Sequence, residues 1–187
     1  MRRIVLTHGL IAGAIMAAMF LVTLPFHDQI GYDRGMIIGY ASMVAAFLLV
    51  FFGVRAYRDD VAGGTVSFGR ALGVGALIVL VASVVYTISW QIVFYTAMPN
   101  YLTDYQAHVL EKMRAAGAAA AELEAKRAEM ARFAELYRNP AVNAALTMLE
   151  PLPVGLVIAL VSAGILRRRP DGERPAEALA PSLGSSR

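Results

Sequence analysis

Four long apolar runs alternate with polar stretches along the chain and predict four transmembrane helices. The runs cover about residues 4–24, 36–54, 71–98 and 144–166. About 20 consecutive apolar residues cross the hydrocarbon core of a bilayer as a helix. Each run is close to that length or longer, so the pattern predicts an all-α fold, a four-helix transmembrane bundle.

The first run has a second interpretation, as the apolar core of a secretory signal peptide. Arg2 and Arg3 precede it, and Ala17 and Ala18 offer small residues for cleavage. The apolar core of a signal peptide is only about 7–15 residues long. The greater length of this run favours an uncleaved transmembrane helix.

One long polar segment, residues 100–139, predicts an extramembrane helical hairpin between the third and fourth membrane helices. It is rich in Ala, Glu, Lys and Arg, which favour helices, and its apolar residues recur at helical spacing. Gly117 stands between the two patterns, where a C-terminal helix cap is expected. Asn139 and Pro140 are typical of an N-cap and a first helical residue, which places the start of the fourth helix before its apolar run.

The composition agrees with a membrane protein in one domain. Hydrophobic residues make up 58% of the 187 residues, and the mean hydropathy is +0.56, whereas soluble chains are typically about 45–50% apolar. We assign residues 1–169 to a single four-span membrane domain. Residues 170–187 are mostly Pro, Ala, Ser and Gly with mixed charge, which predicts a disordered tail.

The distribution of Arg and Lys predicts the orientation in the membrane, because cytoplasmic loops carry an excess of both. The N-terminus and the connection at residues 55–70 are rich in Arg, whereas the connection at residues 25–35 holds only Arg34. Arg167, Arg168 and Arg169 follow the last run. We therefore expect both termini in the cytoplasm and the hairpin outside. The basic residues do not form a stripe with interleaved aromatic residues, which argues against a nucleic-acid partner.

The sequence offers no catalytic, cofactor or metal motif. The chain has no Cys, which excludes disulfides, thiolate nucleophiles and Cys-based metal sites. His8, His27 and His108 are scattered, and neither an HExxH nor a GxSxG motif occurs. We therefore expect a protein that is not an enzyme, with no cofactor.

The candidate functional residues within the apolar runs are Glu150, Pro151, Pro153 and Gln91. A carboxylate inside a membrane helix is costly and often marks function. Pro151 and Pro153 lack backbone donors, which would free the carbonyls of Thr147 and Leu149. A broken helix beside an acid is typical of ion and proton pathways. The alternative is a Glu150 near the membrane interface, hydrated or paired with an Arg.

Small residues at four-residue spacing indicate close helix packing. The candidates are Gly9, Gly13, Gly35, Gly39 and Gly155. Such residues let two helices approach closely in lipid. Packing within one bundle explains them, and homodimerisation through one of these faces is the alternative.

The order of several motifs resembles a known family. The segments "HGLIAGAIMA", "IGYASMVAAFLLVFFGVRAYRD", "GGTVSFGRALGVG" and "LEPLPVGLVIALVSAGIL" carry the resemblance. They are similar to bacterial membrane proteins grouped as domain-of-unknown-function family 4199, over roughly residues 1–169. The resemblance implies a bacterial inner-membrane protein with four spans and supplies no activity. Asn139, Pro140, Glu150, Pro153 and Gly155 match its pattern, whereas Gln91 stands where relatives often carry an acid.

Two functions remain open at this stage. The small size and the absence of catalytic motifs favour a non-enzymatic membrane subunit or scaffold that binds another membrane protein. The alternative is an oligomeric transporter, for a small solute or coupled to protons, that uses Glu150 at the Pro-broken helix. Four spans are few for a complete pathway, so the transporter would need to be a homo-oligomer. The lipid bilayer is the partner expected in either case.

Overall fold

The structure, a computed structural model, describes residues 1–167, apart from the side chain of Asp28. The regular elements of this part are helices: α1 (Arg2–Thr23), the short 3₁₀ helix η1 (Leu24–Phe26), α2 (His27–Asp60), α3 (Phe68–Thr96), α4 (Tyr101–Ala115), α5 (Ala120–Tyr137), α6 (Pro140–Leu149) and α7 (Pro151–Leu166). The predicted all-α class is thereby confirmed for the described residues. The predicted tail, residues 170–187, lies outside them.

Four segments are long and apolar enough to cross a membrane. They are Arg2–Phe26, Gln29–Asp60, Phe68–Thr96 and Pro140–Leu166. The prediction of four spans is confirmed at this level, and the fourth is assembled from the consecutive helices α6 and α7. These four segments fit a multi-pass membrane protein.

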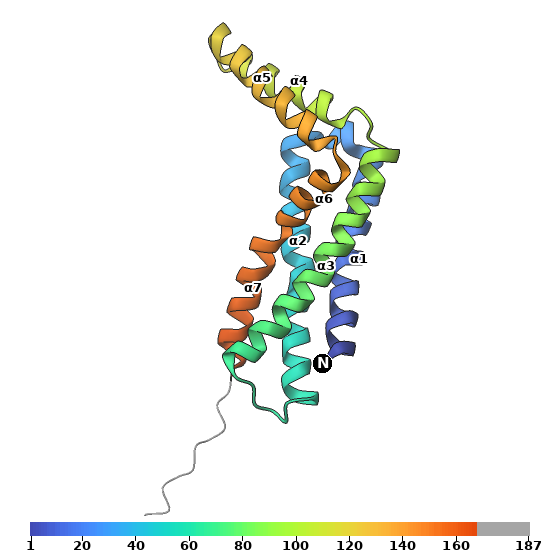
Figure 1. The fold of residues 1–187 in the computed structure, drawn as a ribbon, viewed down its shortest axis with the longest axis vertical. Helices are drawn as coiled ribbons and strands as arrows, with labels where there is room; N and C mark the ends of the chain where they lie inside the picture. The colour runs from blue at the N-terminus through green and yellow to red at the C-terminus, as the bar shows by residue number, and fades with distance from the viewer. Residues whose placement is uncertain (168–187) are drawn as a thin grey trace, which may run out of the picture.

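Helix α3 is central to the packing of the long helices. It runs diagonally across the others in Figure 1 and contacts α1, α2, α6 and α7. Phe47, Val50, Ile78 and Val79 are among the fully buried side chains of the core that α2 and α3 share with α7. In lipid such contacts stabilise the bundle through close van der Waals packing rather than by removing apolar surface from water.

The second membrane helix is longer than its apolar run. We predicted a connection at residues 25–35, but this segment is largely helical, as η1 and the first turns of α2. A kink replaces the loop: Gly31 has φ 71° and ψ 165°, values that side-chain-bearing residues rarely adopt. Helix α2 also continues to Asp60, past the Arg residues that were assigned to the next connection. The polar residues near both ends of α2 therefore lie within the helix and do not end it.

Two helices, α4 and α5, follow α3 and lie side by side, extending sideways beyond the end of the long helices (Figure 1). Gly117, with φ 81°, ends α4 as expected. The N–H of Ala118 donates to the carbonyl of Met113, and the N–H of Gly117 donates to that of Arg114. This is the Schellman arrangement, which reverses the chain after a helix and requires a residue with positive φ.

The start of the fourth span agrees with the sequence. Asn139 is the N-cap of α6, and its side-chain oxygen accepts hydrogen bonds from the backbone N–H groups of Ala141 and Val142 at 2.9 and 3.5 Å. Pro140 is the first helical residue, where its missing N–H costs nothing. The span therefore begins several residues before its apolar run.

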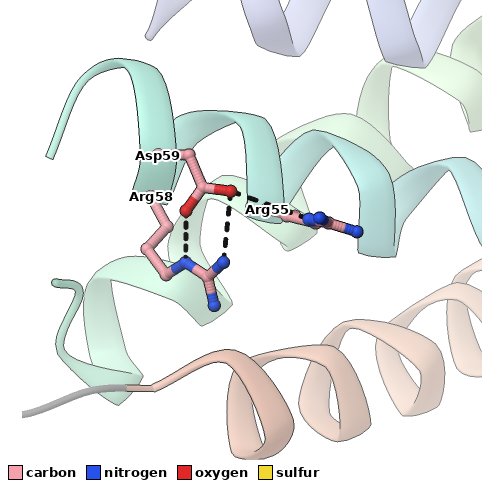
Figure 2. Close-up of polar contacts among 3 residues, drawn as sticks. All are labelled: Arg55, Arg58 and Asp59. Atoms are coloured by element: carbon pink, nitrogen blue, oxygen red, sulfur yellow. Dashed lines mark hydrogen bonds and ion pairs between the residues drawn. The ribbon is translucent and has the colours of Figure 1, made fainter. Parts of the chain in front are cut away.

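Arginine residues gather at the end of the bundle opposite to α4 and α5. This end holds the N-terminus, the connection between α2 and α3, and the end of α7 (Figure 1). Figure 2 shows Asp59 between two arginines of α2, 2.6 Å from Arg58 Nε and 3.6 Å from Arg55 Nε. One carboxylate thus offsets part of the positive charge, and the arginines remain in excess.

Candidate functional site

The residue Glu150 lies at the junction between α6 and α7. Its backbone stays helical, with φ −65° and ψ −53°. Pro151 cannot donate a hydrogen bond to Thr147, so the N–H of Glu150 donates to that carbonyl instead, at 3.3 Å. The predicted break is therefore a local change of hydrogen bonding within a nearly continuous helix, and not an unwound segment.

The Glu150 carboxylate has one hydrogen-bond partner among the described residues. The Tyr86 hydroxyl, from the middle of α3, donates to its Oε2 at 2.9 Å. None of the ion pairs within residues 1–167 includes Glu150. Tyr86 therefore orients the carboxylate and leaves Oε1 available for another group.

This carboxylate lines a cavity of about 460 Å³ near the end of the bundle that carries α4 and α5. Volumes of about 300–1,000 Å³ are typical of sites for small molecules. Every helix from α1 to α5 contributes to the wall, together with the junction of α6 and α7. The lining includes one residue from each of these elements, Phe20, Gly39, Tyr86, Tyr101, Tyr137 and Glu150.

A second cavity, of about 590 Å³, adjoins the first. The two share wall residues that include His27, Gly31 and Tyr101. The second cavity is also lined by the exposed residues Asn100 and Asp104 at the start of α4. The shared residues place the second cavity directly beside the first, toward the start of α4.

A chain of hydrogen bonds lies beside the cavity and joins α3, α5 and α6. The Trp90 indole N–H donates to the Tyr137 hydroxyl at 2.9 Å, and that hydroxyl lies 3.2 Å from Thr147 Oγ1. Thr147 donates to Asn143 Oδ1 at 3.2 Å, and Gln91 Nε2 donates to the same oxygen at 2.8 Å. The chain fixes the α5 end of the cavity wall to the third and fourth spans.

Aromatic rings cover much of the same region. Trp90 and Tyr101 lie 5.3 Å apart in an edge-on arrangement, and Tyr101 stacks on Tyr105 at 6.2 Å. Burial raises the pKa of Tyr101 to about 12, and the neighbouring Tyr137 and Tyr32 add to this shift. Burial likewise raises the pKa of Tyr137. Both phenols are neutral hydrogen-bond donors at physiological pH.

Of the four residues singled out as candidate functional groups, the structure places one in the cavity wall. Glu150 lines the cavity, whereas Gln91 points to Asn143 and belongs to the hydrogen-bonded chain beside it. Pro151 is buried, and Pro153 is exposed on α7. The two prolines instead change the backbone hydrogen bonding around Glu150. Gln91 with Asn143 is a neutral amide pair, so no charged pair forms at that position.

The glycines selected for helix packing divide into two groups. A Cβ at Gly9 or Gly13 would lie 2.6 or 2.5 Å from the Cβ of Val81 or Val85, so this face of α1 already packs on α3. A Cβ at Gly155 would overlap the side chain of Val79 on α3. These three residues therefore pack within the chain.

Gly35 and Gly39 have a different surrounding. A Cβ at Gly39 would meet no atom within 4 Å, and one at Gly35 would meet only Ile30, at 3.9 Å. Both residues line the cavity. The structure thus does not place this pair against another helix of the chain, and their missing side chains leave cavity space.

The aromatic residues and Asn143 are the members of this site that sequence reasoning did not select. Trp90 and Tyr101 were not among the candidate residues, yet both line the cavity and the Trp90 N–H donates to Tyr137. The signal that could have found them is the density of hydrogen-bonding aromatic residues in one stretch, residues 86–105. No group of three or more metal-ligating side chains occurs among the described residues.

Fold and site together fit a multi-pass, all-helical membrane protein with a largely apolar cavity near one end, which Glu150 lines. The chain belongs to the family described as Protein of unknown function (DUF4199), which matches residues 7–168. The family resemblance found in the sequence is thereby confirmed. No curated protein and no solved structure matches the chain.

Proposed function

We propose that the chain is a non-enzymatic solute carrier of the bacterial inner membrane, which binds a small solute in the cavity at Glu150. The observation that carries this proposal is a carboxylate, free of any ion pair in the described chain, in the wall of a cavity of about 460 Å³. Binding pockets of small molecules combine apolar walls with a few polar groups in this way.

The place of Glu150 supports a transport role for this cavity. An ionisable side chain within a membrane span typically marks a substrate or proton pathway. Glu150 lies at the junction of α6 and α7, where two prolines change the backbone hydrogen bonding of a nearly continuous span. Protonation of this carboxylate would couple solute movement to a proton gradient. The complete pathway would require a homo-oligomer.

The proposal is tested by reconstituting the full chain in liposomes that enclose a pH-sensitive dye. Four classes of solute are added in turn: organic cations, amino acids, carboxylates and sugars. We expect at least one class to change the internal pH, and we expect Glu150→Gln to abolish the response. Glu111→Gln is the matched control, because Glu111 is exposed on α4 and lines neither cavity. The absence of flux for all four classes would contradict the proposal.

The orientation proposed for this carrier has both termini in the cytoplasm and the α4–α5 hairpin outside the membrane, on the opposite side. Its support is the gathering of arginines at one end of the bundle, where Arg2, Arg55, Arg70 and Arg167 all lie. The hairpin at the other end has basic and acidic residues in equal number. An excess of Arg beside the spans is typical of the cytoplasmic side.

A membrane subunit or scaffold is the second candidate. The exposed side chains of Phe133 and Leu136 on α5 favour it, since they present apolar surface on a helix outside the core of the bundle. Their occupant would be a second membrane polypeptide. Gentle extraction followed by native mass spectrometry distinguishes the candidates: a reproducible second polypeptide supports the subunit, and a homo-oligomer alone supports the carrier.

A further inference from the structure

Three glycines of α2 line the cavity at Glu150, and this part of the wall is called the glycine floor. Gly31, Gly35 and Gly39 follow one another at four-residue spacing along α2, and all three line the cavity. Gly35 and Gly39 share one face of α2, as residues four apart in a helix do, and Gly31 stands at the kink before them. A Cβ at Gly31 or Gly39 would meet nothing within 4 Å. These positions therefore leave room for a ligand against the backbone of α2.

Another part of the cavity wall is built from aromatic rings. Phe20 of α1 lies 5.0 Å from Tyr86 and 5.6 Å from Trp90, both of α3. Trp90 in turn lies 5.3 Å from Tyr101 of α4. All four rings line the cavity. The π faces of such rings are negative and attract cations.

The charge of the cavity wall has the same sign as those ring faces. Asp33 is paired with Lys112 at 2.8 Å and lies 3.9 Å from His108, so its charge is offset. The Glu150 carboxylate has no such partner within residues 1–167. The described residues of the wall include no Lys or Arg, and His27 is the one imidazole among them. A bound anion would therefore find no fixed cation.

We infer that this cavity binds a monovalent organic cation with an apolar body, such as a protonated amine or a quaternary ammonium ion. The cationic head would lie between the free Oε1 of Glu150 and the aromatic wall, and the apolar body would lie against the glycine floor. Inorganic cations such as Ca²⁺ need six or more oxygen ligands, and the wall offers a single unpaired carboxylate. The inference names the solute class of the carrier proposed above and rests on that proposal.

Trp90 provides a direct probe, because it is the one Trp of the chain and it lines the cavity. The full chain in dodecylmaltoside micelles is titrated with benzyltrimethylammonium, and the Trp fluorescence is recorded. Neopentylbenzene is the neutral analogue of the same shape, and benzenesulfonate is the anionic one. We expect a saturable change with the cation alone. Isothermal titration calorimetry on the same samples detects any binding that leaves the Trp fluorescence unchanged.

Two substitutions locate the site. Glu150→Gln removes the charge and keeps the shape, and we expect it to weaken cation binding at least tenfold, whereas the exposed-surface control Glu111→Gln keeps the affinity. Gly39→Leu fills the cavity and should also weaken binding at least tenfold. Its control is Gly73→Leu on α3, where a Cβ likewise meets nothing within 4 Å but the residue lines neither cavity.

Several results would overturn the inference. They are equal binding of the neutral analogue, unchanged cation affinity in both Glu150→Gln and Gly39→Leu, or the absence of cation binding by fluorescence and calorimetry together. The carrier proposal fails separately. Cation binding without flux in liposomes supports the site and contradicts transport, whereas flux of anions or sugars alone supports transport and contradicts the cation site.

Discussion

The side chain of Asn143 connects the third and fourth spans at a single oxygen. It is fully buried, and its Oδ1 accepts hydrogen bonds from Gln91 and Thr147. Removing this acceptor leaves the Gln91 amide without its partner, whereas Thr147 keeps the Tyr137 hydroxyl at 3.2 Å. An unpaired buried polar group costs about 1–3 kcal/mol, although measured hydrogen bonds between membrane helices average about 0.6 kcal/mol.

We predict that Asn143→Ala lowers the free energy of unfolding by about 1–2 kcal/mol for this reason. The thermal unfolding of the purified protein, followed by the fluorescence of Trp90, measures the change. Asn100→Ala is the matched control, because Asn100 is exposed and its side chain makes no capping hydrogen bond. Equal melting temperatures for the two variants would show that the Asn143 hydrogen bonds contribute nothing to the stability of the protein.

At the scale of the elements, glycines decide how closely α7 approaches α3. Gly155 faces Val79 and the ring of Phe47, whereas Gly164, on the same helix, faces nothing within 4 Å. Both glycines belong to the same apolar run, so only the packing of α7 against other helices distinguishes their roles. The close approach of the two backbones is what a bundle in lipid uses for stability.

We predict that Gly155→Val destabilises the protein by about 1–3 kcal/mol, the usual range for overpacking a tight contact. Gly164→Val should change stability little, because its new side chain points into open space. Melting temperatures in the same detergent compare the pair. If the Gly164 variant proved the less stable, the packing of α7 against α3 would be contradicted.

At the scale of the whole molecule, the orientation proposed above can be tested with single cysteines, since the natural chain has no Cys. Val61→Cys lies in the connection between α2 and α3, and Ala121→Cys lies at the start of α5; both positions are exposed. Right-side-out membrane vesicles are treated with a maleimide that does not cross membranes. We expect the Ala121 variant to be labelled at once and the Val61 variant only after detergent is added. The reverse pattern would invert the proposed topology.

Much of the fold was predictable because the bilayer constrains it strongly. Apolar runs of sufficient length predict spans, since backbone groups in lipid must form their hydrogen bonds within a helix. Local signals also predicted single residues correctly, as with the N-cap Asn139 and the positive φ of Gly117. The prediction of a connection at residues 25–35 was wrong. The polar side chains of this segment suggested a loop, but its backbone stays mostly helical. Asp33, in this segment, forms an ion pair with Lys112 of α4.

The site depended on contacts that no local pattern reports. Glu150 was visible in the sequence as an acid in an apolar run, but its partner Tyr86 is 64 residues away along the chain. Gly9 and Gly35 each begin the same GxxxG motif, yet one packs on α3 and the other lines a cavity. Spacing along one helix determines which residues share a face. Only the arrangement of the other helices determines what that face meets, and this arrangement created the cavity and its aromatic wall.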